Sequence, residues 1–229
     1  MSLFVIGDLH LSLGDPEKSM EIFPGWENYQ ERIEKNWLET IGEQDTIVLA
    51  GDISWGMSLA KAQPDFAFIE KLPGKKILLK GNHDYWWTTK RKMETYFEEN
   101  GFKSLNILHN NHFQYESYGI CGTRGWVNMP DEPADAKVLA REAQRLEVSI
   151  QSAVNAGLEP IVFMHYPPIF GGSFNYDILD VLYRYKIKRC YYGHIHDKGH
   201  SVGIKGTYDD IFFSMISGDY LQFIPEKVM

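Results

Sequence analysis

The stretch KILLKGNHDYWW, residues 76–87, passes directly from an apolar run into the polar group Asn82, His83 and Asp84. A short apolar run bounded by a glycine is typical of a buried strand. This strand would end in an amide, an imidazole and a carboxylate, all of which are groups that bind metal ions in proteins. The stretch therefore predicts a core strand that delivers metal ligands at its carboxyl end.

The same kind of ending recurs four more times along the chain. Each time, a short apolar run is followed within three residues by aspartate or histidine. The run at 2–7 precedes Asp8 and His10, that at 46–51 precedes Asp52, that at 160–164 precedes His165, and that at 189–193 precedes His194 and His196. Five of the eight histidines thus follow predicted core strands, namely His10, His83, His165, His194 and His196.

Segments with helical periodicity separate these strands. They cover residues 28–43, 58–72, 88–101, about 133–156 and 175–186, and Pro64 predicts a kink or a restart in the second of them. Strands that alternate with helices predict a parallel sheet covered by helices. We expect residues 104–123 to form short antiparallel strands with a hairpin turn at Asn110–Asn111, and residues 201–226 to form two or three antiparallel strands. The expected fold is mixed α/β, with two packed sheets and helices outside.

Length and composition favour one domain over residues 1–229, because 229 residues with 44% hydrophobic content suffice for a sizeable core. No apolar run approaches the roughly 20 residues of a membrane-spanning helix. The N-terminal MSLFVIGDLH becomes polar too soon for a secretory signal. We therefore expect a cytoplasmic protein without a membrane partner.

The formal net charge of −8 argues against long duplex nucleic acid as a partner, because such binders usually present a basic face. The one dense basic run, residues 90–92, fits a solvated helix face. Cys121 and Cys190 lie in strand-like stretches and are expected to be buried and unpaired.

Ligands in open α/β sheets bind beyond the carboxyl ends of the strands. Neighbouring parallel strands would bring the five endings to one edge, where carboxylate and amide oxygens face imidazoles. This mixture suits manganese, iron or zinc better than calcium, which prefers oxygen ligands alone.

The ordered set D-x-H, GD, GNHD, H and GHxH, at residues 8–196, resembles the calcineurin-like metallophosphoesterase superfamily. The resemblance implies a four-layer αββα sandwich, with two mixed β-sheets flanked by helices and two divalent metal ions at the strand edge. It implies that the first ion is held by Asp8, His10 and His196, that the second is held by Asn82, His165 and His194, and that Asp52 bridges both.

The resemblance also implies a reaction. A metal-bridging hydroxide would attack a phosphomonoester or phosphodiester in line, with His83 as a catalytic residue that is not a ligand. Asp84 is either a catalytic residue that orients the site from behind the ligands or a turn cap.

The sequence departs from two branches of the superfamily. Protein Ser/Thr phosphatases follow the bridging aspartate with Asp-Arg-Gly and have GNHE, whereas this chain has GDISWGM and GNHD. A protein phosphatase is therefore not expected. Some nuclease-like members place a second histidine where this chain has Trp55, which argues against a nuclease-type histidine pair.

Several residues near the motifs could contact the substrate. Arg124 in GTRGW is either a cation that grips phosphate or part of a surface ion pair. Trp55 and Trp86, with Tyr85, Trp87 and Trp126, either stack on a flat group of the substrate or pack the loops. His109, His112 and His200 have no evident partner.

We expect a phosphohydrolase acting on a small phosphate ester. One alternative is a phosphodiesterase for nucleotides or single-stranded nucleic acid, suggested by the aromatic residues. An alternative of another class is a non-catalytic metal-binding scaffold, which the complete set of ligand positions disfavours.

Overall fold

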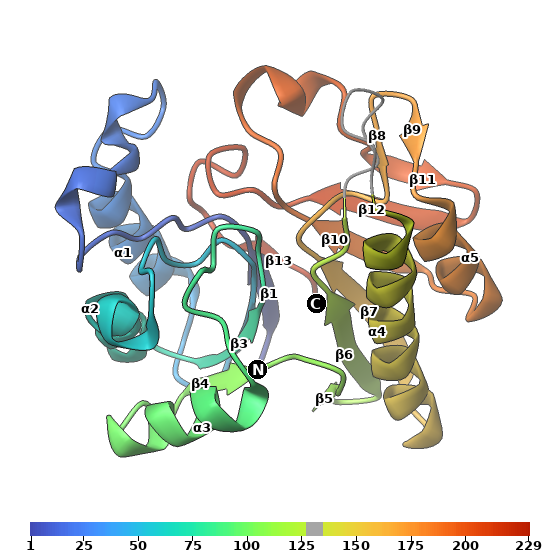
Figure 1. The fold of residues 1–229 in the computed structure, drawn as a ribbon, viewed down its shortest axis with the longest axis horizontal. Coiled ribbons are helices and arrows are strands. Elements are labelled where there is room, and N and C mark those ends of the chain that lie inside the picture. Colours follow the sequence, from blue (N-terminus) through green and yellow to red (C-terminus); the bar gives the residue numbers. More distant parts are fainter. Residues whose placement is uncertain (127–134) are drawn as a thin grey trace.

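The computed structural model describes residues 1–126 and 135–229. Two β-sheets pack face to face, with helices α1, α2 and α3 outside one sheet and α4 and α5 outside the other (Figure 1). This is the expected four-layer arrangement of two mixed sheets flanked by helices.

The first sheet has the order β13-β1-β2-β3-β4. Its strands are β1 (Leu3–Ile6), β2 (Thr46–Ala50), β3 (Lys75–Leu79), β4 (Leu105–Ile107) and β13 (Glu226–Lys227). The pairs β1–β2, β2–β3 and β3–β4 are parallel, and β13 is antiparallel to β1. The carboxyl ends of β1, β2 and β3 therefore meet at one edge.

The second sheet has the order β11-β12-β10-β7-β6-β5. Its strands are β5 (Phe113–Tyr115), β6 (Tyr118–Thr123), β7 (Glu159–Met164), β10 (Arg189–Tyr192), β11 (Gly206–Tyr208) and β12 (Ile211–Met215). The four central strands, β6, β7, β10 and β12, are parallel to one another. A separate small hairpin consists of β8 (Ile169–Phe170) and β9 (Ser173–Phe174).

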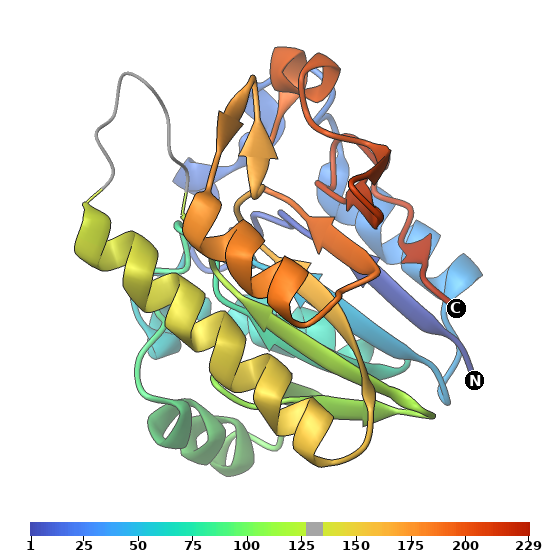
Figure 2. The same ribbon diagram turned by 90° about the vertical axis from the view of Figure 1, so that its right-hand side faces the viewer.

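The helices are amphipathic and cover the outer face of each sheet. Their bounds are α1 (Tyr29–Thr40), α2 (Leu59–Lys71), α3 (Lys90–Glu99), α4 (Ala136–Asn155) and α5 (Tyr176–Arg184). Short 3₁₀ turns lie at Pro16–Lys18, Met20–Ile22 and Asp197–Ser201. Figure 2 shows α4 and α5 side by side across the second sheet.

Alternate side chains of a strand pack into different layers of the structure. In β1, Phe4 and Ile6 pack against the outer helices, whereas Leu3 and Val5 face the second sheet. Successive side chains of a strand point to opposite faces, so a run of apolar residues buried on both faces makes an inner layer of such a sandwich. The core therefore has three parts, one between the sheets and one under each helical layer.

The expected antiparallel hairpin at Asn110–Asn111 is wrong. β4 is parallel to β3 in the first sheet, and the segment after it crosses to the second sheet, where β5 and β6 form the hairpin. Asn110 has a φ of 58°. Asparagine tolerates the left-handed region, which marks a change of chain direction but does not show which strands it joins.

Three other expectations concern single elements. α2 is one continuous helix that contains Pro64, so the helix does not restart there, and a kink at Pro64 stays a prediction. β12 is parallel to β10 and antiparallel only to β11, so the C-terminal strands are not all antiparallel. The helix expected from about residue 133 begins at Ala136 in the described part, and Pro133 lies outside the described residues.

Cys121 and Cys190 are buried and free, as expected. In the two described ranges, no helix is both long and apolar enough to cross a bilayer.

Candidate metal centre

All seven predicted ligands lie at the common edge where the strands of both sheets end. Asp8 and His10 follow β1, Asp52 follows β2, Asn82 follows β3, His165 follows β7, and His194 and His196 follow β10. Each sheet therefore contributes ligands. The sequence predicted this convergence, and the parallel strands of each sheet explain it.

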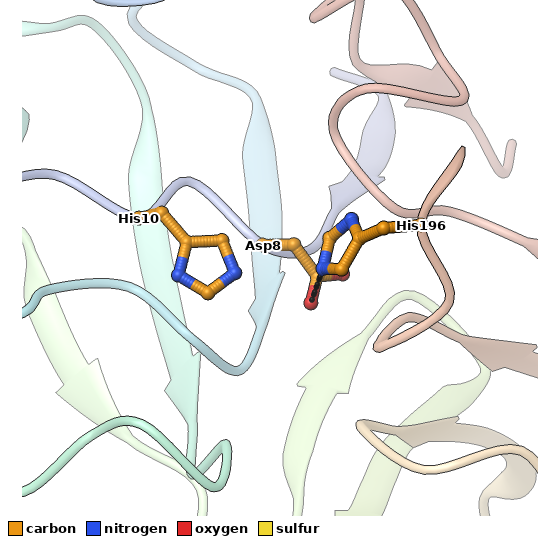
Figure 3. A group of neighbouring side chains, drawn as sticks. All are labelled: Asp8, His10 and His196. Carbon is orange, nitrogen blue, oxygen red and sulfur yellow. Dashed lines mark ion pairs between the residues drawn. The ribbon is translucent and has the colours of Figure 1, made fainter. Parts of the chain in front are cut away.

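The first group consists of Asp8, His10 and His196, which each offer a ligand atom within 4.8 Å of the others. Figure 3 shows Asp8 between the two imidazole rings. Nε2 of His196 is 3.5 Å from Oδ1 of Asp8. Asp8 and His10 come from the first sheet and His196 from the second, so this group spans the gap between the sheets.

The second group consists of Asp52, His165 and His194, again within 4.8 Å of one another. Nδ1 of His194 is 3.2 Å from Nε2 of His165. The side-chain oxygen of Asn82 lies 2.6 Å from the same Nε2 atom, which places Asn82 in the group.

Asp52 stands between the two groups. Its Oδ2 atom is 3.6 Å from Nε2 of His10 and 3.5 Å from Nε2 of His165. A carboxylate in this position could serve one ion on each side.

Unusual backbone geometry positions the ligands. Asp8, His10, Asp52 and His194 all have positive φ, between 46° and 71°. Such conformations cost on the order of 1–3 kcal/mol each for residues other than glycine and cluster at functional sites. Backbone hydrogen bonds hold them, including those from the amide of Asp8 to the Gly51 carbonyl (2.9 Å) and from the amide of His10 to the Asp52 carbonyl (2.8 Å).

The glycines of the motifs allow this close approach. A Cβ atom on Gly81 would lie 2.1 Å from Oδ1 of Asp52, and one on Gly193 would lie 2.3 Å from Oδ2 of Asp8. Both contacts are far shorter than van der Waals distance and involve carboxylates held in place by the backbone. The glycine of GNHD and the glycine of GHIH are therefore part of the site.

Burial keeps three of the histidines neutral. It lowers the pKa of His165 and His194 to about 3 each, and it lowers the pKa of His10 well below its usual value. Nδ1 of His165 donates to the Ala50 carbonyl at 3.2 Å, which leaves the Nε2 lone pair facing Asn82 and Asp52. Neutral imidazoles with free lone pairs are the form that binds metal ions.

The acidic groups favour a cation. Burial, and then the neighbouring Asp8 carboxylate, raise the pKa of Asp52 well above its usual range. Nε2 of His10 is buried and has no hydrogen-bond partner among the described residues. Two neighbouring carboxylates beside an unpartnered imidazole nitrogen make a set of ligand atoms that divalent cations fit.

Asp219 is a member of the site that sequence reasoning missed. Its Oδ1 atom accepts a hydrogen bond from Nδ1 of His196 at 2.9 Å, and its Oδ2 atom lies 3.2 Å from Nε2 of His200. Burial opposes the charge on His196, but the hydrogen bonds to Asp219 and Asp8 outweigh it and raise the pKa of His196 to about 10. Asp219 thus fixes the ring so that Nε2 faces Asp8, and its other oxygen lies within ion-pair distance of His200 without a hydrogen bond to it.

We expect Asp219→Ala to weaken the binding of Mn²⁺, because a carboxylate behind a ligating histidine typically contributes 10- to 100-fold in metal affinity. Calorimetric titration with Mn²⁺ measures the change. The matched control is Asp210→Asn in the exposed turn between β11 and β12, which should bind like the parent protein. Equal affinity in Asp219→Ala and the parent would show that Asp219 does not support a ligand.

His83 lies beside the centre and outside both groups. Its amide donates to Oδ1 of Asp52 at 2.7 Å, and its ring centroid is 4.4 Å from that of Trp55. Burial lowers the pKa of His83, and the side chain is half-buried. The histidine is thus placed to meet a group bound at the ligands without being one of them.

Asp84 is buried and organises two of the motif loops. Its carboxylate accepts hydrogen bonds from the amides of Gly81 (2.7 Å), Asp52 (3.0 Å), Ile53 (2.9 Å) and Ser54 (3.3 Å). It is 1% exposed. Of the two roles expected for Asp84, the structure supports an orienting one behind the ligands, and it places the carboxylate out of reach of a substrate.

The three residues expected to contact the substrate differ in their surroundings. Trp86 is 2% exposed and donates to Asp84 at 3.0 Å, so it supports the loop and offers no ring face to a substrate. Trp55 stacks on the ring of His10 at 5.1 Å and is partly buried, and its role as a substrate contact stays a prediction. Arg124 lies 3.7 Å from Oε1 of Glu142, so it forms an ion pair, but its partner is buried and the pair is not at the surface as expected, and a contact with phosphate stays a prediction.

Comparisons with known proteins agree with this geometry. Residues 1–198 match the family model for calcineurin-like phosphoesterases. No curated protein sequence matched the chain.

Solved structures share the fold at low sequence identity. A protein of unknown function from Aquifex aeolicus has a TM-score of 0.56 and 14% identity, over 99% of this chain and 95% of that one. A phosphopantetheinyl hydrolase from Mycobacterium tuberculosis has a TM-score of 0.53 and 13% identity, over 100% and 95%. The family match extends over most of the chain and includes every predicted ligand, and we conclude that this protein belongs to the calcineurin-like phosphoesterase family.

Proposed function

We propose that the protein is a two-metal phosphohydrolase that cleaves a small phosphomonoester or phosphodiester. The observation that carries the proposal is the pair of ligand groups that share the Asp52 carboxylate. Family membership supports phosphate-ester hydrolysis in general. The number of ions, the ligand assignment and the class of ester belong to the proposal.

In this proposal, one divalent ion would be held by Asp8, His10 and His196 and the other by Asn82, His165 and His194, and the Asp52 carboxylate would serve both. Two such ions would lower the pKa of a bound water molecule towards neutrality, and they would offset the negative charge of the phosphate. The neutral state of His10, His165 and His194 means that these three imidazoles lose no proton on binding.

His83 would act on the substrate directly. Its ring, half-buried beside Trp55, would donate a proton to the leaving oxygen or a hydrogen bond to a phosphate oxygen. Burial lowers the pKa of this ring in the free protein, and an anionic phosphate nearby would raise it again. Asp52 positions His83 through the hydrogen bond to its backbone amide.

The two alternatives are weaker on structural grounds. Of the aromatic residues that suggested a nucleotide phosphodiesterase, Trp86 is buried against Asp84 and packs beside Trp87 at 5.2 Å. A non-catalytic scaffold has no need for His83 next to a complete set of ligand positions.

The test is a Mn²⁺ titration of metal-free protein, followed both by calorimetry and by hydrolysis of p-nitrophenyl phosphate and bis-p-nitrophenyl phosphate. We expect about two ions per chain, with hydrolysis rising as they bind, and the preferred compound separates monoester from diester activity. Protein that binds two ions and hydrolyses neither compound nor any other phosphoester would support the scaffold instead.

A further inference from the structure

A cavity of about 240 Å³ lies beside the first ligand group. Its lining is mostly apolar, and one of its walls is a predicted metal ligand. The lining residues are Met20, Phe23, Pro24, Trp26, His196 and Asp197. Residues 20–26 carry no recognisable motif, so this cavity could not be located from the sequence.

Trp26 lines the cavity and also packs against two of the predicted ligands. Its ring centroid is 5.6 Å from that of His10 and 5.6 Å from that of His196. Trp26 and His196, which both line the cavity, therefore place it directly against the first ligand group.

The wall next to the ligands is buried and closely packed. Trp26 is 3% exposed and is held edge-on by Tyr29 at 5.5 Å and by Phe223 at 5.1 Å. Phe23 forms the outer wall, where it is 48% exposed. The cavity thus has a fixed inner end at the ligands and an outer end open to solvent.

The chemistry of the lining selects its occupant. The only charged side chain in the described lining, apart from histidine, is the carboxylate of Asp197, and none of the lining residues is lysine or arginine. Apart from His196, which the proposed function assigns to a metal ion, a second phosphate or a carboxylate would find no cationic side chain among these lining residues. A cavity of about 150 Å³ lined by apolar residues holds a benzene ring, so 240 Å³ accommodates a substituted ring or a short alkyl chain.

We propose that this cavity binds an uncharged, apolar ester substituent of the substrate and makes the protein selective for aryl or alkyl phosphate esters. The proposal rests on the proposed phosphohydrolase function, because it assumes that the phosphate lies at the ligand groups. It specifies the class of substrate, which the ligand groups alone do not.

The first test compares esters that differ only in the apolar chain. Hexyl phosphate is compared with methyl phosphate, and hexyl p-nitrophenyl phosphate with methyl p-nitrophenyl phosphate, in Mn²⁺-loaded protein. We expect kcat/KM to favour the hexyl compound of the active pair by about tenfold or more, which is the effect of burying about two methylene groups.

Two substitutions at Phe23 test the assignment of the cavity. Phe23→Ala removes the outer wall, and Phe23→Asp adds a second carboxylate to it, so both should reduce the hexyl-to-methyl ratio, the second more strongly. The matched control is Ile22→Ala, since Ile22 is 80% exposed and lies next to Phe23 but outside the lining. It should keep the ratio of the parent protein.

A binding measurement distinguishes a failure of the cavity assignment from a failure of the proposed phosphohydrolase function. Hexylphosphonate should bind Mn²⁺-loaded protein more tightly than methylphosphonate by calorimetry, and Phe23→Asp should remove the difference. Hydrolysis of hexyl and methyl esters at equal kcat/KM, or equal binding of the two phosphonates, would overturn the assignment of the cavity while leaving the phosphohydrolase intact. Tight, Phe23-dependent binding of hexylphosphonate without hydrolysis of any ester would support the cavity and overturn the proposed function.

Discussion

Asp52→Asn is expected to reduce hydrolysis by more than about 10²-fold, the upper range for losing a group that merely supports a ligand. Asp52 is the carboxylate that faces both ligand groups, at 3.6 Å from His10 and 3.5 Å from His165. An amide keeps the shape of the side chain but removes the negative charge that two cations would share. Both ions should therefore bind more weakly, and the loss should exceed that of any substitution confined to one group.

The measurement is paired, with a Mn²⁺ titration by calorimetry and the rate of p-nitrophenyl or bis-p-nitrophenyl phosphate hydrolysis at saturating Mn²⁺. The control is Asp65→Asn, since Asp65 is equally buried at 1% exposed but binds the hydroxyl of Ser54 and the amide of Leu13. Because these hydrogen bonds involve no predicted ligand, Asp65→Asn should leave the Mn²⁺ stoichiometry unchanged. Two ions bound with parental affinity in Asp52→Asn would show that this carboxylate is not shared.

His83→Ala should lower kcat by about 10²- to 10⁴-fold, the usual contribution of a positioned acid–base group. Metal binding should stay close to parental, because His83 contacts Asp52 through its backbone amide, which alanine retains. The ring itself packs on Trp55 and approaches the hydroxyl of Tyr85 at 3.3 Å. The loss should thus appear in turnover and not in the Mn²⁺ titration.

The matched control for His83 is His112→Ala, which removes an imidazole that hydrogen-bonds Ser152 at 2.7 Å, away from the ligand groups. That variant should keep parental turnover. If His83→Ala instead lost a metal ion, His83 would be a ligand and the assignment of the second group would have to change.

The sequence predicted the strands that carry ligands because two local signals coincide at each of them. Apolar runs such as LFVI and TIVLA identify buried strands, and Asp8 or Asp52 follows within two residues of the strand end. Parallel pairing then places these ends at one edge, so no long-range information beyond the fold class was needed. The resemblance to a known family assigned the ligands to two groups, and the geometry of the structure is consistent with that division.

Asp219 was missed although its local signal is similar. The run IFFSMIS is followed by Gly218 and Asp219, much as TIVLA is followed by Gly51 and Asp52. The C-terminal strands were expected to be antiparallel, which would have sent the end of β12 away from the ligand edge. β12 is in fact parallel to β10, so the carboxylate arrives next to His196.

Trp26 and Trp86 show a different limit of the sequence. Both are tryptophans in loops, yet Trp26 lines a cavity at the ligands and Trp86 is buried under Asp84. Tryptophan both packs and binds, and the choice between the two depends on which loops meet, which is a property of the tertiary fold.

Each ligand group draws side chains from both sheets, and this has a mechanical consequence. A bound ion would link the two sheets at the edge where Asp8 and His10, which follow a strand of the first sheet, meet His196, which follows a strand of the second. Separating the two sheets would require releasing the ion. A metal-ion concentration 100 times the dissociation constant would therefore add about 2.7 kcal/mol to the free energy of separation for each independent site. The ions proposed for catalysis would then also stabilise the fold.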